Sequence, residues 1–140
     1  MAAERYGPRD FKRLVGHWVP LFGLDHWELS FEWVGDSRIV DSDRGQVFGQ
    51  SFIQAEEQRA HIRIMADRPT ADVLRTFLHE LTHVLLAETE LVCHVMTEAM
   101  SDELQERTKQ LLDVATERLA MRIPTIVMEQ APEGRRPEGY

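Results

Sequence analysis

The sequence predicts a small α+β domain with an N-terminal helix, a sheet of three or four mostly antiparallel strands, and two further helices. Three observations support this prediction. Apolar residues recur at helical spacing over residues 8–20, alternate strictly with polar residues over 26–34, and return to helical spacing from residue 70 onward. At 140 residues the chain has the length of one domain with its own core.

The first two elements have clear local signals. Pro8 suits the first turn of a helix, and Pro20 with Gly23 marks its end. The strand over 26–34 places four large apolar residues on one face, which favours core packing over a ligand groove: Trp27, Leu29, Phe31 and Trp33.

Two further extended segments predict a hairpin. They span residues 45–55 and 59–66, and the stretch from 35 to 45 before them is rich in polar residues and predicts an exposed loop. The segment 59–66 alternates small or apolar residues with polar ones, as an edge strand covered on one face would.

The next helix, predicted over residues 70–88, carries the sequence His79-Glu80-Leu81-Thr82-His83. Residues four apart lie on one helical face, so both imidazoles can reach one metal ion. Zinc accepts such ligands, and a carboxylate at Glu80 can take a proton from zinc-bound water. The alternative is that His79 and His83 are hydrogen-bonded core histidines without a metal.

A second polar pattern follows a turn that we expect over residues 88–93. His94, Glu98 and Asp102 are spaced four apart near the start of a helix predicted over 95–119. A catalytic zinc takes three protein ligands, and its histidines need carboxylate partners. Glu98 is therefore the expected third ligand and Asp102 the carboxylate behind a ligating histidine. An exposed acidic helix face is the alternative reading.

The last twenty residues differ in composition from the rest of the chain. Residues 121–140 contain three prolines and two glycines, and within them residues 123–128 predict one more extended segment followed by a loose tail. We therefore expect a catalytic domain over residues 1–120.

Composition narrows the class of protein. A formal net charge of −8 disfavours nucleic-acid binding, and no apolar run is long enough for a membrane span. The start of the chain has no apolar signal core, and the single cysteine, Cys93, cannot form an internal disulfide. These features predict a cytoplasmic protein whose metal binding does not depend on thiolates.

The two motifs together resemble the gluzincin clan of zinc peptidases, the clan of thermolysin. That clan pairs H-E-x-x-H on one helix with E-x-x-x-D on the next, as in Glu98-Ala99-Met100-Ser101-Asp102. The resemblance implies a zincin-like fold in which His79, His83 and Glu98 bind zinc, Glu80 activates water and Asp102 orients a histidine. The order of elements also resembles the short minigluzincins, in which the C-terminal stretch occupies the cleft.

The chain departs from the clan in two respects. Only 15 residues separate His83 from Glu98, and no separate lobe supplies an oxyanion stabiliser, for which His94 is the candidate. The chain is also similar to ImmA/IrrE-type peptidases and to SprT-like proteases. The latter use a histidine as third ligand, a role open to His94, but the glycine that follows it in that family is missing.

The expected activity is zinc-dependent hydrolysis of a peptide or protein, with the substrate lying antiparallel along an edge strand over residues 59–65. The alternative is a non-catalytic or latent zinc-bearing module that binds a partner protein as a regulator.

Overall fold

The computed structural model describes residues 4–35, 39–41 and 45–130. The elements follow in the order α1 (Pro8–Leu21), β1 (Glu28–Val34), β2 (Ile39–Asp41), β3 (Gly45–Val47), β4 (Gly49–Gln54), β5 (Arg59–Met65), α2 (Thr70–Thr97) and α3 (Asp102–Gln130). The small α+β class predicted from the sequence is confirmed.

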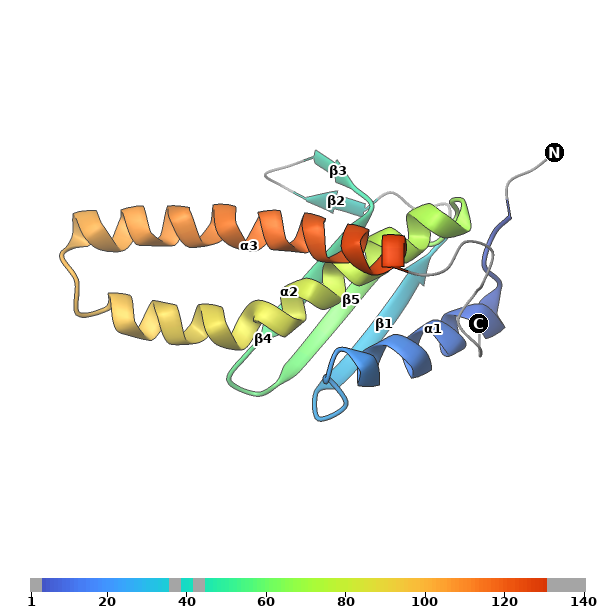
Figure 1. Ribbon diagram of the computed structural model, residues 1–140, viewed down its shortest axis with the longest axis horizontal. Helices are drawn as coiled ribbons and strands as arrows, with labels where there is room; N and C mark the ends of the chain where they lie inside the picture. Colours follow the sequence, from blue (N-terminus) through green and yellow to red (C-terminus); the bar gives the residue numbers. More distant parts are fainter. Residues whose placement is uncertain (1–3, 36–38, 42–44, 131–140) are drawn as a thin grey trace.

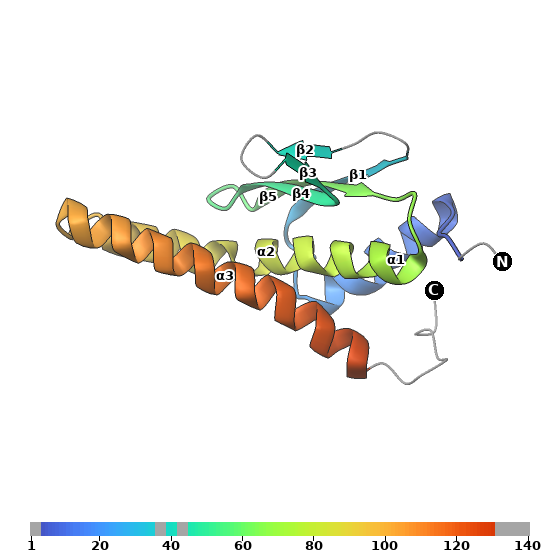
Figure 2. The same cartoon turned by 90° about the horizontal axis from the view of Figure 1, so that it is seen from above.

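The sheet forms one layer, and α1 and α2 cover one of its faces (Figure 2). Helix α3 runs antiparallel beside α2 (Figure 1). The two helices extend together beyond the sheet as a long hairpin, on the left of Figure 1. The part of α2 nearest the sheet is therefore packed between β-strands and α3.

The three-stranded sheet has the order β1-β5-β4. β5 pairs antiparallel with β4, which confirms the predicted hairpin, but it pairs parallel with β1. The sheet is thus mixed rather than mostly antiparallel, and β5 is its central strand rather than an edge. Burial explains the central position of β5, because a strand with neighbours on both sides is best shielded from water. Its inward-facing side chains are at most 2% exposed: Ala60, Ile62 and Ile64. Residues 39–47, expected to be loop and the start of a strand, contain the short antiparallel pair β2–β3.

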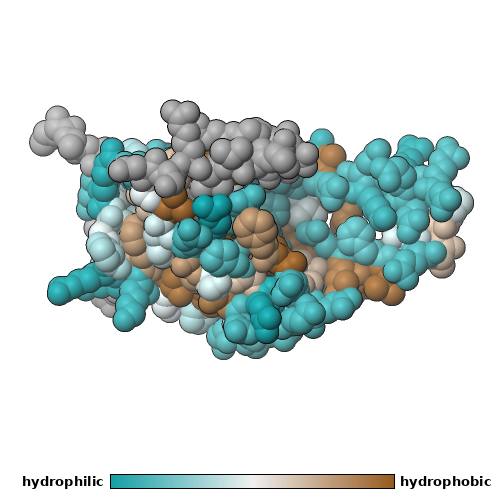
Figure 3. All heavy atoms as spheres, turned by 180° about the vertical axis from the view of Figure 1, so that it is seen from behind, coloured by the Kyte–Doolittle hydropathy of each residue, from teal (hydrophilic) through white to brown (hydrophobic). Residues whose placement is uncertain are grey.

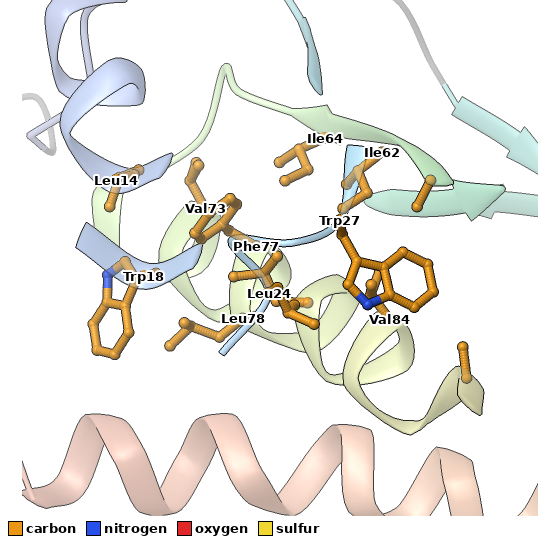
Figure 4. Close-up of a cluster of buried hydrophobic side chains, with 13 residues drawn as sticks. Leu14, Trp18, Leu24, Trp27, Ile62, Ile64, Val73, Phe77, Leu78 and Val84 are labelled. Atoms are coloured by element: carbon orange, nitrogen blue, oxygen red, sulfur yellow. The ribbon is translucent and has the colours of Figure 1, made fainter. Parts of the chain in front are cut away.

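The core lies between β5, α1 and α2 (Figure 4). Phe77 of α2 is fully buried, and its ring lies 5.6 Å from that of Phe31 and 5.8 Å from that of Trp33. Phe11 of α1 stacks on Trp33 at 4.2 Å. The aromatic face predicted for the first strand therefore packs against the core, as expected, although Phe31 and Trp33 also line a pocket between β1 and α1.

Helix α2 is longer than predicted, and no turn interrupts it over residues 88–93. The sequence has no glycine or proline between Thr70 and Ser101, so nothing there breaks the helix. The helix ends where the Thr97 hydroxyl donates to the His94 carbonyl at 2.8 Å. Ser101 then caps the start of α3: it stands just before the helix, and its carbonyl accepts a hydrogen bond from the Gln105 amide at 2.8 Å.

The segment predicted to be extended over residues 123–128 is the last part of α3. Pro124 lies inside this helix and is buried, and the residue four positions earlier, Ala120, is small and also buried. Val127 and Met128 pack against the core cluster. These contacts outweigh the strand preference of the β-branched residues. The segment therefore packs on the core and does not fill the cleft, contrary to what the resemblance to minigluzincins suggested. The tail over 131–140 lies outside the described residues.

No helix in the described ranges combines enough length and apolarity to cross a lipid bilayer.

The continuity of α2 can be tested at Thr89, an exposed position in the stretch expected to turn. We expect Thr89→Pro to lower the free energy of unfolding by about 3 kcal/mol, because proline removes a helical hydrogen bond and clashes with the preceding turn. Chemical denaturation measures this, and Thr89→Ala is the matched control. A proline variant as stable as the alanine variant would contradict an uninterrupted helix.

Candidate metal centre

Three side chains from two helices meet at the base of the α2–α3 hairpin. His79 and His83 come from α2 and Glu117 from α3. The Nε2 atom of His79 lies 3.3 Å from Glu117 Oε1, and Nε2 of His83 lies 3.2 Å from Glu117 Oε2. The two Nε2 atoms are themselves 3.2 Å apart. All four potential ligand atoms therefore converge on one point.

The position of the turn explains why Glu117 is the residue that meets the histidines. The four residues 98–101 join the helices, so the hairpin turns near Met100. His83 lies 17 residues before Met100 (100 − 83 = 17), and Glu117 lies 17 residues after it (117 − 100 = 17). Equal path lengths along two antiparallel helices bring these two residues to the same level.

The surroundings hold this cluster partly away from water. The side chains of His79 and His83 are 21% and 20% exposed, and that of Glu117 is 35% exposed. Thr82, between the histidines in sequence, is fully buried and donates its hydroxyl to the Leu78 carbonyl at 2.7 Å. The histidines are thus anchored on a well-packed turn of helix.

Glu80 lies on the sheet side of the same helix and is only 6% exposed. Strand β4 passes very close to it at Gly49. A Cβ atom placed on Gly49 would lie 2.6 Å from Thr76 Cγ2 and 3.0 Å from Glu80 Oε1. Only a residue without a side chain lets β4 approach the Glu80 carboxylate this closely.

A cleft of about 670 Å³ opens beside these residues. One wall is β4, which ends the sheet order of the described strands, and the other is α2 with Glu117 of α3. His79, Glu80 and His83 all line it. The cleft therefore joins the candidate metal ligands, a buried carboxylate and the border strand of the sheet.

Farther along α2, Glu90 and His94 also line this cleft. Burial raises the pKa of the Glu90 carboxyl above its ordinary value of 4.5, and the charge of Asp113 adds to the rise. His94 and a hydrogen bond with Thr116 act in the opposite direction on the same pKa.

The donor set fits a zinc ion. Two imidazole nitrogens and one carboxylate form a common three-residue set of catalytic zinc sites. Ligands about 2.1 Å from a tetrahedral ion stand about 3.4 Å from one another, close to the 3.2–3.3 Å separations observed here. Two ring nitrogens that face each other can share one hydrogen at most, whereas a cation satisfies both lone pairs.

The structure brings together only some of the residues predicted from the sequence. His79, Glu80 and His83 lie together as expected. Glu98 does not join them: it is exposed at the C-terminal end of α2, 15 residues and roughly 22 Å of helix beyond His83. Glu117 stands in the place expected for Glu98.

Asp102 and His94 are also distant from the histidine pair. Asp102 is exposed at the start of α3 and cannot orient either histidine. His94 lines the cleft but follows His83 by 11 residues, roughly 16 Å along the helix, which is too far for an oxyanion stabiliser at the metal.

A sequence signal for Glu117 did exist. Ser101 followed by Asp102 and Glu103 is a typical helix start, with a capping residue and acidic residues in the first turn. Placing the turn there, instead of over 88–93, moves the position opposite His83 to Glu117.

Comparisons with protein-family models, with curated proteins and with solved structures found no match for this chain.

The ligand set is tested by zinc affinity in two matched variants. We expect Glu117→Gln to weaken zinc binding at least about 100-fold, because losing a ligand costs more than losing an outer hydrogen-bond partner. Glu98→Gln should leave the affinity unchanged. Competition titration with a chelating dye measures both, and the reverse order of effects would favour the ligand set expected from the sequence.

The raised pKa of Glu90 predicts a pH-dependent stability difference. Its charge is disfavoured in the folded state, so its contribution to stability is present below pH 4.5 and lost as the pH rises through the raised pKa. Glu90→Gln removes this loss, and in metal-free protein we expect it to raise the melting temperature at pH 7 but not at pH 4. Exposed Glu98→Gln is the control and should show no such trend. If Glu90→Gln instead lowered the melting temperature relative to wild type more at pH 7 than at pH 4, the raised pKa of Glu90 would be contradicted.

Proposed function

We propose that this chain is a zinc-dependent peptidase that hydrolyses peptide bonds in the cleft between β4 and the α2–α3 hairpin. The observation that carries the proposal is the convergence of His79, His83 and Glu117 on one point, next to the buried carboxylate of Glu80. A structural zinc site needs no acid beside it, whereas a hydrolytic site needs a base.

Each residue has a defined part in this proposal. His79, His83 and Glu117 hold the ion, which when bound supplies a Lewis acid for the peptide carbonyl and lowers the pKa of a water molecule. Glu80 accepts the proton of the attacking water and then donates it to the leaving amine. Glu80 lines the same cleft as the two histidines, so its carboxylate is placed to reach a substrate held there.

The border strand of the sheet suggests how a substrate is held. An extended peptide can pair with the outer edge of β4 and satisfy its backbone groups there. Gly49, Gln50 and Ser51 line the cleft on this strand. We therefore propose β4 as the substrate-binding strand. Residues 59–65, which the sequence suggested for this role, form the central strand β5 and have no open edge.

The gluzincin resemblance supports the proposal in a modified form. The clan's arrangement of a glutamate from a second helix opposite H-E-x-x-H is met by Glu117 and not by Glu98. Met121, four residues after Glu117, stands where the motif E-x-x-x-D has its aspartate. The likeness thus rests on the arrangement of helices and donors.

The test is Glu80→Gln in zinc-loaded protein. Removing the base should lower kcat for peptide hydrolysis by at least about 100-fold, because general-base catalysis typically contributes 10²–10⁴-fold. Zinc content should stay the same, since Glu80 is not a ligand. A peptide library followed by mass spectrometry provides the readout.

The alternative, a zinc-bearing module that binds a partner without cleavage, gives a different result. In that case the wild type and Glu80→Gln both bind zinc and neither cleaves any library peptide. That outcome would reject the peptidase proposal while leaving the metal centre in place.

A further inference from the structure

A second pocket adjoins the cleft at the end nearest the start of α2. It has a volume of about 360 Å³ and meets the cleft beside the candidate metal centre. Four residues line both spaces: Val47, Gly49, His79 and Glu80. The residues that line this second space alone include two arginines, Arg68 and Arg75, and we name it the arginine pocket.

The guanidinium of Arg68 is held in place by a hydroxyl and an aromatic ring. Its Nη1 atom donates to Thr76 Oγ1 at 3.0 Å, and its Cζ atom lies 3.7 Å from the centre of the Phe48 ring. Arg68 is partly buried, and in the ranges that the structure describes it forms no ion pair. Because a guanidinium has five N–H donors in a planar fork, Arg68 keeps donors for a ligand.

Thr76 links Arg68 to the proposed base. Thr76 and Glu80 are one helical turn apart, and both approach Gly49 of β4. A Cβ atom on Gly49 would lie 2.6 Å from Thr76 Cγ2 and 3.0 Å from Glu80 Oε1. Thr76 therefore contacts the Arg68 guanidinium and lies next to Glu80, which places the guanidinium within the span of about three extended peptide residues from the base.

Arg75 adds a second cation from the helix that carries the histidines. Arg75, His79 and His83 are spaced four apart, so they lie on one face of α2, with about 6 Å of helix axis between one and the next. The Nη1 atom of Arg75 donates to Thr125 Oγ1 of α3 at 3.0 Å. Arg75 is exposed, and among the described residues it too has no carboxylate in an ion pair. Both arginines are therefore available to an anionic group.

Charge distinguishes the arginine pocket from the rest of the cleft. Among the described residues that line the pocket alone, Asp72 is the one carboxylate, so the two arginines leave a net positive charge. The described lining of the cleft has no lysine or arginine, and its end beyond His83 carries three glutamates: Glu56, Glu57 and Glu90.

The hairpin beyond the cleft is acidic as well. Residues 85–116 contain seven Asp or Glu against two Lys or Arg. Figure 3 shows hydrophilic side chains over much of this projecting end, on the right of that view. A carboxylate on a substrate is therefore repelled from this end of the cleft and attracted to the arginine pocket.

We propose that Arg68 and Arg75 form a subsite for a carboxylate group of the peptide substrate. The inference rests on the proposed peptidase function. The planar fork of a guanidinium matches the two oxygens of a carboxylate. A peptide paired antiparallel with β4, which runs from Gly49 to Gln54, has its C-terminal side at Gly49 and so at the arginine pocket. The bound group is therefore the C-terminal carboxylate or an Asp or Glu side chain on that side of the cleaved bond.

The test measures peptide binding to the full chain with the substitution Glu80→Gln, loaded with zinc, so that binding is observed without cleavage. The probes are random hexapeptide pools of uncharged residues with an uncharged dye at the N-terminus. One pair of pools compares a free C-terminal carboxylate with a C-terminal amide. A second pair, both amides, compares one fixed Glu with one fixed Gln. In at least one pair, fluorescence polarisation should give the carboxylate member a dissociation constant at least about tenfold lower.

The two arginines are tested separately. Arg68→Gln and Arg75→Gln should each reduce the preference for the carboxylate at least about fivefold, because each removes charged donors from the pocket. Arg59→Gln is the matched control and should keep the full preference, since Arg59 pairs with Glu28 at 3.1 Å and lines neither space. If circular dichroism shows that Arg68→Gln is unfolded, Arg68→Lys replaces it and should also lower the preference, because lysine lacks the planar fork.

The outcomes separate the source of the carboxylate and the two proposals. A preference within the first pair of pools identifies the C-terminal carboxylate, a preference within the second identifies a side chain, and either supports the subsite. Equal binding of both members of each pair, no binding of any pool, or a preference that survives both arginine substitutions would overturn it. Failure of the peptidase proposal gives a different result: the wild type cleaves no peptide, while the arginine-dependent preference persists with and without zinc.

Discussion

The antiparallel pairing of α2 with α3 is the constraint on which the candidate site depends. Neither helix alone offers three metal ligands, because α2 supplies two histidines and α3 the carboxylate of Glu117. The pairing must also have one register, since a shift of a single turn along α3 would move Glu117 by about 5.4 Å. The buried residues between the helices and the four-residue turn fix that register together.

Helix α2 links the fold to the site because its faces have different partners. Val73, Phe77 and Leu81 pack in the core. His79 and His83 point to α3, and Glu80 lies against β4. A helix buried on most sides in this way is held rigidly, so its polar residues keep the fixed geometry that the proposed metal binding and proton transfer would require.

The sequence allowed prediction of the elements whose signals are local. The helix over residues 8–20 and the strand over 26–34 match α1 and β1 closely, because periodicity and the residues Pro8 and Gly23 define them without reference to the rest of the chain. The parallel pairing of β1 with β5 was missed, because partner choice in a sheet depends on distant segments. The third candidate ligand, Glu117, was missed for a related reason, since a turn placed about ten residues too early selects a different carboxylate.

Gly49 has a consequence for recognising this arrangement in other sequences. H-E-x-x-H can occur on any buried helix, but here the glutamate keeps its place only because the neighbouring strand has no side chain where it crosses. A chain with the same five residues and a bulkier residue at the equivalent of position 49 would have to displace either the strand or the carboxylate. A glycine that follows a short strand pair and precedes the helix by about 20 residues is therefore a diagnostic feature that pattern searches for the histidines alone would overlook.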